Sequence, residues 1–299
     1  MGTAQVTARS TLARGKLRPF AIPSCALTAD DLRRLYDVLD NKAREAAEHQ
    51  VTTLQQLPGQ TTEQFEQVKA NLRSSLSLVV KVQGINGEWT GSSTREALRD
   101  DSLPDSVAVV EYNSAFLFRT QLNVEPQNSF SIYLDFSRTG ILDMTNLSSE
   151  PASNRSGSWI SGMNTTWVNG TYEEIRTFFA ERETSRGWLH SRHAYDLAVL
   201  VLGIPASFAL VYRIDRVLRP VLRVPDALFV ALYVYLVLMA LFGFRLLFNY
   251  AKWVFPKIEG PTRREGGPKL HKAVLILIGS TFVSVVVETF LRMLGLALP

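Results

Sequence analysis

The sequence is poor in the residue types and motifs that mark most reactive sites, with one cysteine and four histidines. A lone Cys25 excludes an intramolecular disulfide and a zinc site built from cysteines, and it suits a reducing compartment. The first 19 residues carry four basic side chains, but no apolar run of about 7–15 residues follows them, so no signal peptide is predicted. These absences favour a cytoplasmic N-terminal domain.

Motifs for phosphate binding and covalent catalysis are missing too. The segments 84–87 and 91–94 contain glycine, serine and threonine, but no lysine precedes the hydroxyl residues as a P-loop requires. We interpret them as parts of a hairpin turn. The glycines around Ser158 stand at the wrong distance for a nucleophile elbow. The sequence therefore predicts a protein that is not an enzyme and that has no cofactor.

Two sets of polar side chains nevertheless have the composition of a reactive site. His190, His193 and Asp196 recur at a spacing of three, which would place metal ligands on one helix face. Asp135 and Asp143 flank a strand and a turn, and two carboxylates can serve in acid–base chemistry. Structural roles at a membrane-helix entry, a strand end and a turn also explain these residues, and we favour them. No metal ligand or catalytic residue is assigned.

Charge is distributed unevenly along the chain. From Ser191 onward there are 13 of the 32 Lys and Arg residues and 6 of the 28 Asp and Glu residues, which leaves 19 and 22 for the first 190 residues. The first part is mildly acidic and the second strongly basic. A nucleic-acid-binding domain would gather basic residues on its folded part to meet phosphates, so nucleic acid is not an expected partner.

The chain is predicted to have a flexible tail and two domains. Residues 1–27 show no hydrophobic periodicity. Residues 28–190 contain strand-like and helix-like segments without the strict alternation of a doubly wound sheet, and residues 191–299 contain long apolar runs. The predicted fold class is an α+β domain, with a mostly antiparallel sheet flanked by helices, followed by an all-α membrane domain.

The α+β domain is predicted to open with a helical hairpin. Thr28 and Asp31 have the spacing of a capping box, and apolar residues then recur every three or four positions towards Leu57. A second helix is predicted from Thr61. The hairpin would pack against the core of the domain, with packing against a second copy of the chain as the alternative.

Strand-like segments fill the middle of this domain, and Thr171 and Glu174 form a further capping-box pattern that predicts a closing helix. The predicted strands span residues 76–82, 88–90, 106–110, 115–118, 129–136, 158–160 and 166–168.

Three long apolar runs occupy the last third of the chain, each close to or above the ~20 residues that a helix needs to cross a hydrocarbon core of ~30 Å. The expected protein is therefore a multi-pass membrane protein in contact with the lipid bilayer. The predicted spans lie near residues 194–212, 227–248 and 273–298.

The basic residues beside these spans predict their orientation. Nine Lys and Arg residues lie on the side of the N-terminal domain, and five lie on the other side. The positive-inside rule therefore predicts a cytoplasmic N-terminal domain. Four arginines between the first two spans reduce the asymmetry. Within the first span, Pro205 lacks a backbone donor and predicts a kink.

One carboxylate stands inside the third predicted span. Glu288 lies about 22 Å along the helix from Ala273, and an intramembrane carboxylate is a functional candidate. Arg292 follows one turn later on the same face and can pair with it. We interpret Glu288 and Arg292 as a structural ion pair, with an ion or proton path as the alternative.

These features favour a membrane-anchored regulatory or interaction protein, whose cytoplasmic domain binds a ligand, a protein partner or a second copy of the chain. The alternative is a membrane-permeabilising effector whose soluble domain gates oligomerisation of the spans. A membrane-tethered enzyme using carboxylates such as Asp135 and Asp143 ranks third, and a transporter ranks last.

Overall fold

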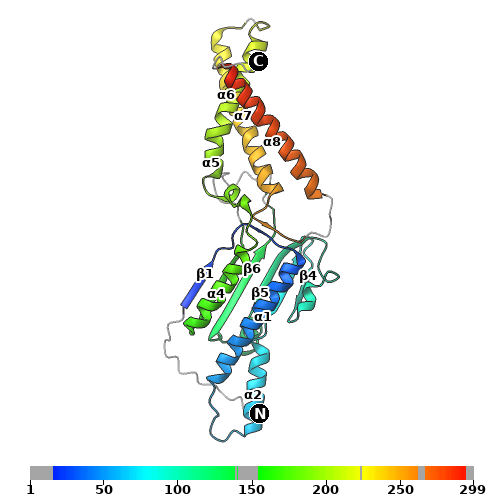
Figure 1. Cartoon of the computed structure of the whole chain (residues 1–299), viewed down its shortest axis with the longest axis vertical. Coiled ribbons are helices and arrows are strands. Elements are labelled where there is room, and N and C mark those ends of the chain that lie inside the picture. The colour runs from blue at the N-terminus through cyan, green and yellow to red at the C-terminus, as the bar shows by residue number, and fades with distance from the viewer. Residues whose placement is uncertain (1–15, 139, 141–153, 223, 262–266, 294–299) are drawn as a thin grey trace. The chain divides into compact units, whose positions relative to one another are not determined.

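The computed structural model describes residues 16–138, 140, 154–222, 224–261 and 267–293. These residues divide into two compact units. The sheet unit runs up to Asp135 and again from Arg155 to Glu183, and the helical unit is formed mainly from Thr184 onward. The predicted order is confirmed, because an antiparallel sheet with helices precedes a C-terminal helical region (Figure 1).

A six-stranded sheet in which every neighbouring pair is antiparallel forms the centre of the sheet unit. The spatial order is β1-β7-β6-β5-β3-β4, so the first and fourth strands form the edges. The strands are β1 (Lys16–Phe20), β3 (Val79–Gly84), β4 (Trp89–Ser92), β5 (Val107–Asn113), β6 (Asn128–Asp135) and β7 (Gly157–Gly162), and a two-residue strand, β2 (Cys25–Ala26), lies apart from this sheet.

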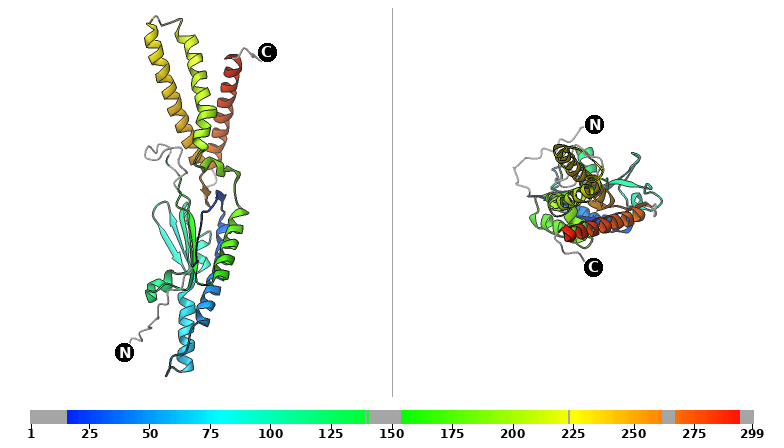
Figure 2. Two further views of the ribbon diagram at one scale, coloured as in Figure 1. Left: turned by 90° about the vertical axis from the view of Figure 1, so that its left-hand side faces the viewer. Right: turned by 90° about the horizontal axis from the view of Figure 1, so that it is seen from above.

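The long helices α1 (Ala29–Thr52) and α4 (Thr165–Ala180) cover one face of the sheet (Figure 2). Their inward side chains meet alternate residues of the strands, and such fully buried apolar side chains stabilise the fold by roughly 1.5–3 kcal/mol each. Tyr112 of β5 is fully buried, and its hydroxyl donates a hydrogen bond of 2.9 Å to the carbonyl oxygen of Leu32 in α1. The core of the unit therefore lies between this face and the two helices.

The predicted start of the first helix is confirmed, whereas its predicted end is wrong. The hydroxyl of Thr28 accepts from the amide of Asp31 at 3.1 Å, and the carboxylate of Asp31 accepts from the amide of Thr28 at 2.9 Å. α1 ends at Thr52 rather than near Leu57. The hydroxyl of Thr53 donates to a carbonyl of the last turn at 2.7 Å, which satisfies a free acceptor and lets the chain leave the helix.

The same Asp31 also ties the start of α1 to the end of α4. Nε of Arg182 donates to its carboxylate at 2.8 Å. Partial burial alone would raise the pKa of Asp31, but hydrogen bonds from Thr28 and Arg182 outweigh burial and lower that pKa. The carboxylate is therefore held ionised where both covering helices come together.

The second helix, α2 (Thr62–Ser75), starts where the sequence predicts it. Thr61 caps it, with its hydroxyl accepting from the amide of Gln64 at 3.3 Å. Arg73 then pairs with Glu48 of α1 at 2.7 Å, so the two helices form the predicted hairpin within one chain.

The predicted strand at 115–118 is wrong, because this segment begins a short helix, α3 (Phe116–Leu122). In this helix Phe118 is buried in a cluster with Leu76, the residue that ends α2, and Ala47 of α1. Asn123 adopts a left-handed conformation, with φ of 53°, and ends the helix. Tertiary packing has overridden the strand preference of the phenylalanines.

The predicted short strand at 166–168 is also wrong, and so is the predicted start of the closing helix. α4 begins earlier, because the side chain of Asn164 accepts from the amide of Trp167 at 3.1 Å and caps it. Thr171, expected as a cap, is buried inside the helix.

The tail predicted for residues 1–27 contains a strand. β1 pairs with β7 in a register that runs from Lys16 opposite Gly162 to Phe20 opposite Ser158. β1 has only five residues, and its partner β7 is distant in the chain. The local sequence therefore shows no detectable hydrophobic periodicity.

The helical unit contains three long helical stretches. α5, η3 and α6 are continuous over Ala194–Leu218, with η3 forming a π-helical turn. Pro205 has no N–H to donate to the carbonyl of Val201, and the widened turn accommodates this loss. The elements are η2 (Ser185–His190), α5 (Ala194–Ala198), η3 (Val199–Gly203), α6 (Ile204–Leu218), α7 (Asp226–Val254), β8 (Ile258–Glu259) and α8 (Gly267–Met293).

Two of these stretches are long and apolar enough to cross a membrane, namely Ala194–Leu218 with 25 residues and Asp226–Val254 with 29 residues. Only 17% and 11% of their most apolar windows are buried, unlike the core helix of a soluble protein. α8 has a shorter apolar stretch, Leu270–Thr281, and the third predicted span, 273–298, continues beyond the described residues.

Candidate functional site

The three residues considered as metal ligands do not form a common site. The ring of His190 is buried, and its Nε2 lies 2.8 Å from the carbonyl oxygen of Phe255, to which it must donate. The side chain of His193 is 82% exposed and lies 3.9 Å from the carboxylate of Asp196. Within the described residues, no group of three or more His, Cys, Asp or Glu side chains could hold a metal ion.

The surroundings of His190 also disfavour a cation. Burial lowers the pKa of His190 to about 4, against the opposing effect of its hydrogen bond to Phe255, and the charges of Lys252 and Lys257 lower it further. His190 is thus a neutral ring beside two ammonium groups. Its role is structural, because its hydrogen bond to Phe255 stabilises the end of α7.

Asp135 has a structural explanation as well. It is buried at the end of β6, where its carboxylate accepts from the amide of Arg155 at 3.3 Å. Its own amide donates to the hydroxyl of Ser156 at 2.7 Å. These bonds hold the returning chain against the end of the strand. Asp143 lies outside the described residues, so its pairing with Asp135 stays a prediction.

Glu288 and Arg292 lie within contact of each other, with 2.5 Å between Oε1 and Nη2. A third residue from another helix joins them. Nε of Arg213 in α6 donates to the hydroxyl of the buried Thr289 at 2.9 Å, and its Nη2 lies 3.9 Å from Oε2 of Glu288. The candidate pair is thus part of a polar connection between α6 and α8.

A second polar connection links α6 to α7. The hydroxyl of Tyr233 donates to the carboxylate of Asp215, and Nε of Arg219 lies 3.2 Å from the same carboxylate. The guanidinium of Arg216 stacks over the ring of Tyr212 at 4.7 Å. Several arginines that reduce the charge asymmetry of the sequence therefore have partners within the helical unit.

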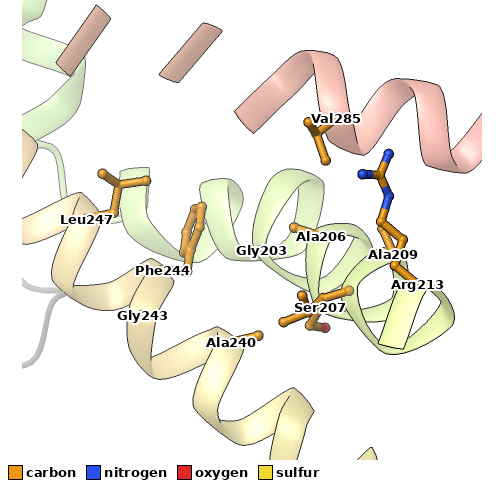
Figure 3. Close-up of a pocket in the computed structure, with 11 residues that line it drawn as sticks. Gly203, Ala206, Ser207, Ala209, Arg213, Ala240, Gly243, Phe244, Leu247 and Val285 are labelled. Atoms are coloured by element: carbon orange, nitrogen blue, oxygen red, sulfur yellow. The ribbon is translucent and has the colours of Figure 1, made fainter. Parts of the chain in front are cut away.

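An apolar cavity of about 350 Å³ lies between α6 and α7, next to these connections (Figure 3). Gly203 faces Phe244 so closely that an added Cβ would lie 3.2 Å from the ring. The small residues that line the cavity are Gly203, Ala206, Ser207, Ala209, Ala240 and Gly243.

The sheet unit offers two further surfaces. The first is the face of the sheet opposite α1 and α4, which we call the open face (Figure 2). Trp159 projects from it and is 48% exposed, and the exposed Leu17 of β1 lies on the same face, one step along the strands. Two polar rows run across it, namely Gly157, Tyr133, Glu111 and Lys81, and beside them Trp159, Ser131 and Asn113.

The second surface is a polar cleft of about 640 Å³ between α1, α2 and the segment after β4. Three arginines and three carboxylates line it and neutralise one another. The N–O distances are 2.6 Å for Arg44–Asp40, 2.7 Å for Arg73–Glu48 and 3.4 Å for Arg95–Asp37. Because these charges are already paired, the cleft has little net attraction for an ion.

Comparison with protein-family models, with curated protein sequences and with solved structures finds no match to this chain. Its function is therefore argued from the geometry alone.

The contacts of Arg213 with Glu288 and with Thr289 were not predicted from the sequence. A signal for them exists in the sequence, because four arginines stand at or after the end of the first span, where the positive-inside rule expects few. Such an excess indicates that some of these arginines have intramolecular partners.

Acidification should weaken the helical unit through His190. A histidine in an unfolded chain binds a proton with a pKa near 6.5, whereas folded His190 does so only near about 4. Between these values the unfolded chain binds more protons, so the free energy of unfolding falls as the pH decreases, by up to about 3 kcal/mol at low pH. Thermal unfolding of the full-length protein in detergent, at neutral pH and near pH 4.5, measures the loss.

The variant His190→Gln is the control. Glutamine keeps an N–H for the carbonyl of Phe255 but does not titrate, so the variant should lose less stability on acidification than the wild type. An equal loss in both proteins would show that His190 is not the responsible group.

Proposed function

We propose that this protein is a membrane-anchored interaction protein, in which three transmembrane helices hold the sheet unit at the cytoplasmic surface and the open face binds a protein partner. The observation that carries this proposal is the exposure of apolar side chains along the helical unit.

Those side chains occur along both of the long apolar stretches. On α7 alone Leu228, Val234 and Leu238 are exposed, and on α6 Phe208 is exposed. Exposing apolar surface to water costs roughly 25 cal/mol for each Å², and soluble monomers rarely expose contiguous apolar patches beyond a few hundred Å². A hydrocarbon surrounding removes this cost, which supports a bilayer location.

α8 supports a third crossing. It has 27 described residues, a length of about 40 Å, and Ile276 and Leu277 on it are exposed. Its one carboxylate, Glu288, is paired with Arg292 and lies near Arg213, which lowers the cost of placing it near the edge of a hydrocarbon core.

The open face is the better of the two surfaces for a partner. Exposed tryptophan and leucine beside polar side chains are typical of protein interfaces, where aromatic residues contribute much of the binding energy. Trp159 and Leu17 meet this description. In the polar cleft, by contrast, the charges already neutralise one another.

Single cysteines introduced into a Cys25→Ala background test the orientation of the protein in the membrane. The one native cysteine, Cys25, is buried. Ile85, after β3, and Val221, between α6 and α7, are a matched pair with exposed fractions of 72% and 74%. In intact cells a membrane-impermeant maleimide should label Val221→Cys, and it should label Ile85→Cys only after permeabilisation. Leu298→Cys tests the third crossing and should behave like Val221→Cys.

Two results would contradict this arrangement. Labelling of Ile85→Cys in intact cells would reverse the orientation, and protection of Leu298→Cys would remove the third crossing.

A photoreactive amino acid placed at Ser131 tests partner binding by the open face. Ser131 lies in the middle of that face, beside Trp159. Irradiation of cells should give a discrete protein adduct from this position, and Trp159→Ala should reduce its yield. Glu173, exposed on α4, is the matched control and should give no such adduct. Equal adduct patterns from Ser131 and Glu173 would argue against the open face.

A second candidate function is a membrane-permeabilising effector. The observation that favours it is the polar contacts that α6 makes with α7 and α8, because ionisable groups inside membrane helices often mark an ion or proton path. Under our first proposal the same contacts only hold the helices together.

Dye release from liposomes separates these two functions. We expect the reconstituted wild type to leave the liposomes tight, because Glu288 is neutralised by arginine. The effector would instead release dye and arrest growth on expression, and Glu288→Ala would abolish both effects. Asp196→Ala, which removes an exposed carboxylate from α5, on a different helix from Glu288, is the control.

A further inference from the structure

The cavity between α6 and α7 is apolar except at one end. A Cβ added to Gly243 would meet no atom within 4 Å, so the backbone of α7 itself borders the space. Val285 of α8 lines another side. Among the described residues that line the cavity, Arg213 is the one charged group, and Figure 3 shows it beside α8.

The walls of this cavity suit a hydrocarbon chain. Its volume of about 350 Å³ falls within the roughly 300–1,000 Å³ of small-molecule sites. Water is a poor occupant away from Arg213, because it needs two to four polar partners. The other lining residues are apolar except Ser207, whose hydroxyl donates to the carbonyl of Ile204 at 2.7 Å. Membrane helices associate through van der Waals packing, so an apolar chain in this space would complete the contact between α6 and α7.

Arg213 gives the cavity an anion-binding end. Its Nε donates to Thr289, but its Nη2 lies 3.9 Å from Glu288, beyond hydrogen-bonding distance. A guanidinium has five N–H donors in a planar fork. Within the described part of the chain, Arg213 therefore keeps donors for a carboxylate or phosphate, which bind guanidinium groups strongly.

The local charge also favours an anion. Arg213 and Arg292 share one carboxylate, that of Glu288, so this group of three residues carries one positive charge in excess. An anionic head on Arg213 would balance that excess.

We propose that this cavity binds the acyl chain of an anionic amphiphile, whose carboxylate or phosphate head lies on Arg213. A free fatty acid and an anionic phospholipid share this chemistry. The inference rests on the proposed membrane location of α6, α7 and α8.

The test uses the full-length protein in phosphatidylcholine nanodiscs and three spin-labelled probes, namely stearate, phosphatidylglycerol and phosphatidylcholine. Electron paramagnetic resonance should show an immobilised component for at least one anionic probe. Immobilised stearate alone identifies a fatty-acid site, whereas immobilised phosphatidylglycerol identifies a phospholipid site.

Variants of the protein test whether the immobilised spectral component comes from a probe bound in the cavity. Gly243→Leu fills the space and should abolish the component, whereas Gly279→Leu, which adds the same side chain to an open position on α8, should keep it. Arg213→Gln should weaken binding of the anionic probe about tenfold, the effect of losing one charge-assisted hydrogen bond. Arg216→Gln, beside Tyr212 and outside the cavity lining, should leave it unchanged.

Three outcomes would overturn the inference: no immobilised anionic probe, equal immobilisation of phosphatidylcholine, or a component that survives Gly243→Leu. Failure of the proposed function is a different result, because a protein without membrane helices would not incorporate into the nanodiscs at all.

Discussion

Many apolar side chains along α6 and α7 are exposed, and the membrane location that we propose would surround them with hydrocarbon instead of water. Much of the architecture agrees with this constraint. A helix satisfies its own backbone hydrogen bonds, so it can enter hydrocarbon, whereas a sheet with open edges cannot. The chain separates the two kinds of structure accordingly. Among the described residues the six-stranded sheet ends at β1 and β4, and it belongs to a unit with its own core. The long apolar helices α6 and α7 belong to the other unit.

Within the helical unit, α6 makes polar contacts with both α7 and α8. Arg213 reaches Thr289 of α8, and two residues later Asp215 accepts from Tyr233 of α7. In surroundings of low dielectric constant such bonds are strong, and an unpaired partner is costly. Helices without a hydrophobic driving force between them need contacts of this kind to choose their neighbours. The arginines near the end of α6 therefore contribute to packing within the helical unit.

The parts of the fold that depend on local chemistry could be predicted from the sequence. The capping box of Thr28 and Asp31 is complete within four residues, and the alternation along β6 repeats over a whole strand. The parts that depend on distant contacts could not. β1 is paired with the distant β7, and the helix that contains Phe118 packs that ring against Leu76 from another part of the chain.

The candidate site also has parts that could be predicted from the local sequence and parts that could not. The spacing of Glu288 and Arg292 shows that they share a helix face, but the contribution of Arg213 requires knowledge of how α6 packs on α8. The open face is implied by polar residues that alternate with apolar ones along β5 and β6, and the exposed position of Trp159 beside Leu17 emerges only from the strand order.

The π-helical turn η3 has a consequence for the way in which α5 and α6 meet α7. Each residue of an α-helix advances about 100° round its axis, so Tyr195 and Gly203, eight residues apart, would differ by about 80° in a regular helix. The turn takes up roughly one additional residue and brings the two positions to within about 20° of each other. Tyr195 can then pack on Phe248, with 5.2 Å between ring centres, while Gly203 lies against Phe244 on the same side. The π-helical turn thus sets the rotation of α5 relative to α6 about their common axis. As a result, both segments contact the same side of α7.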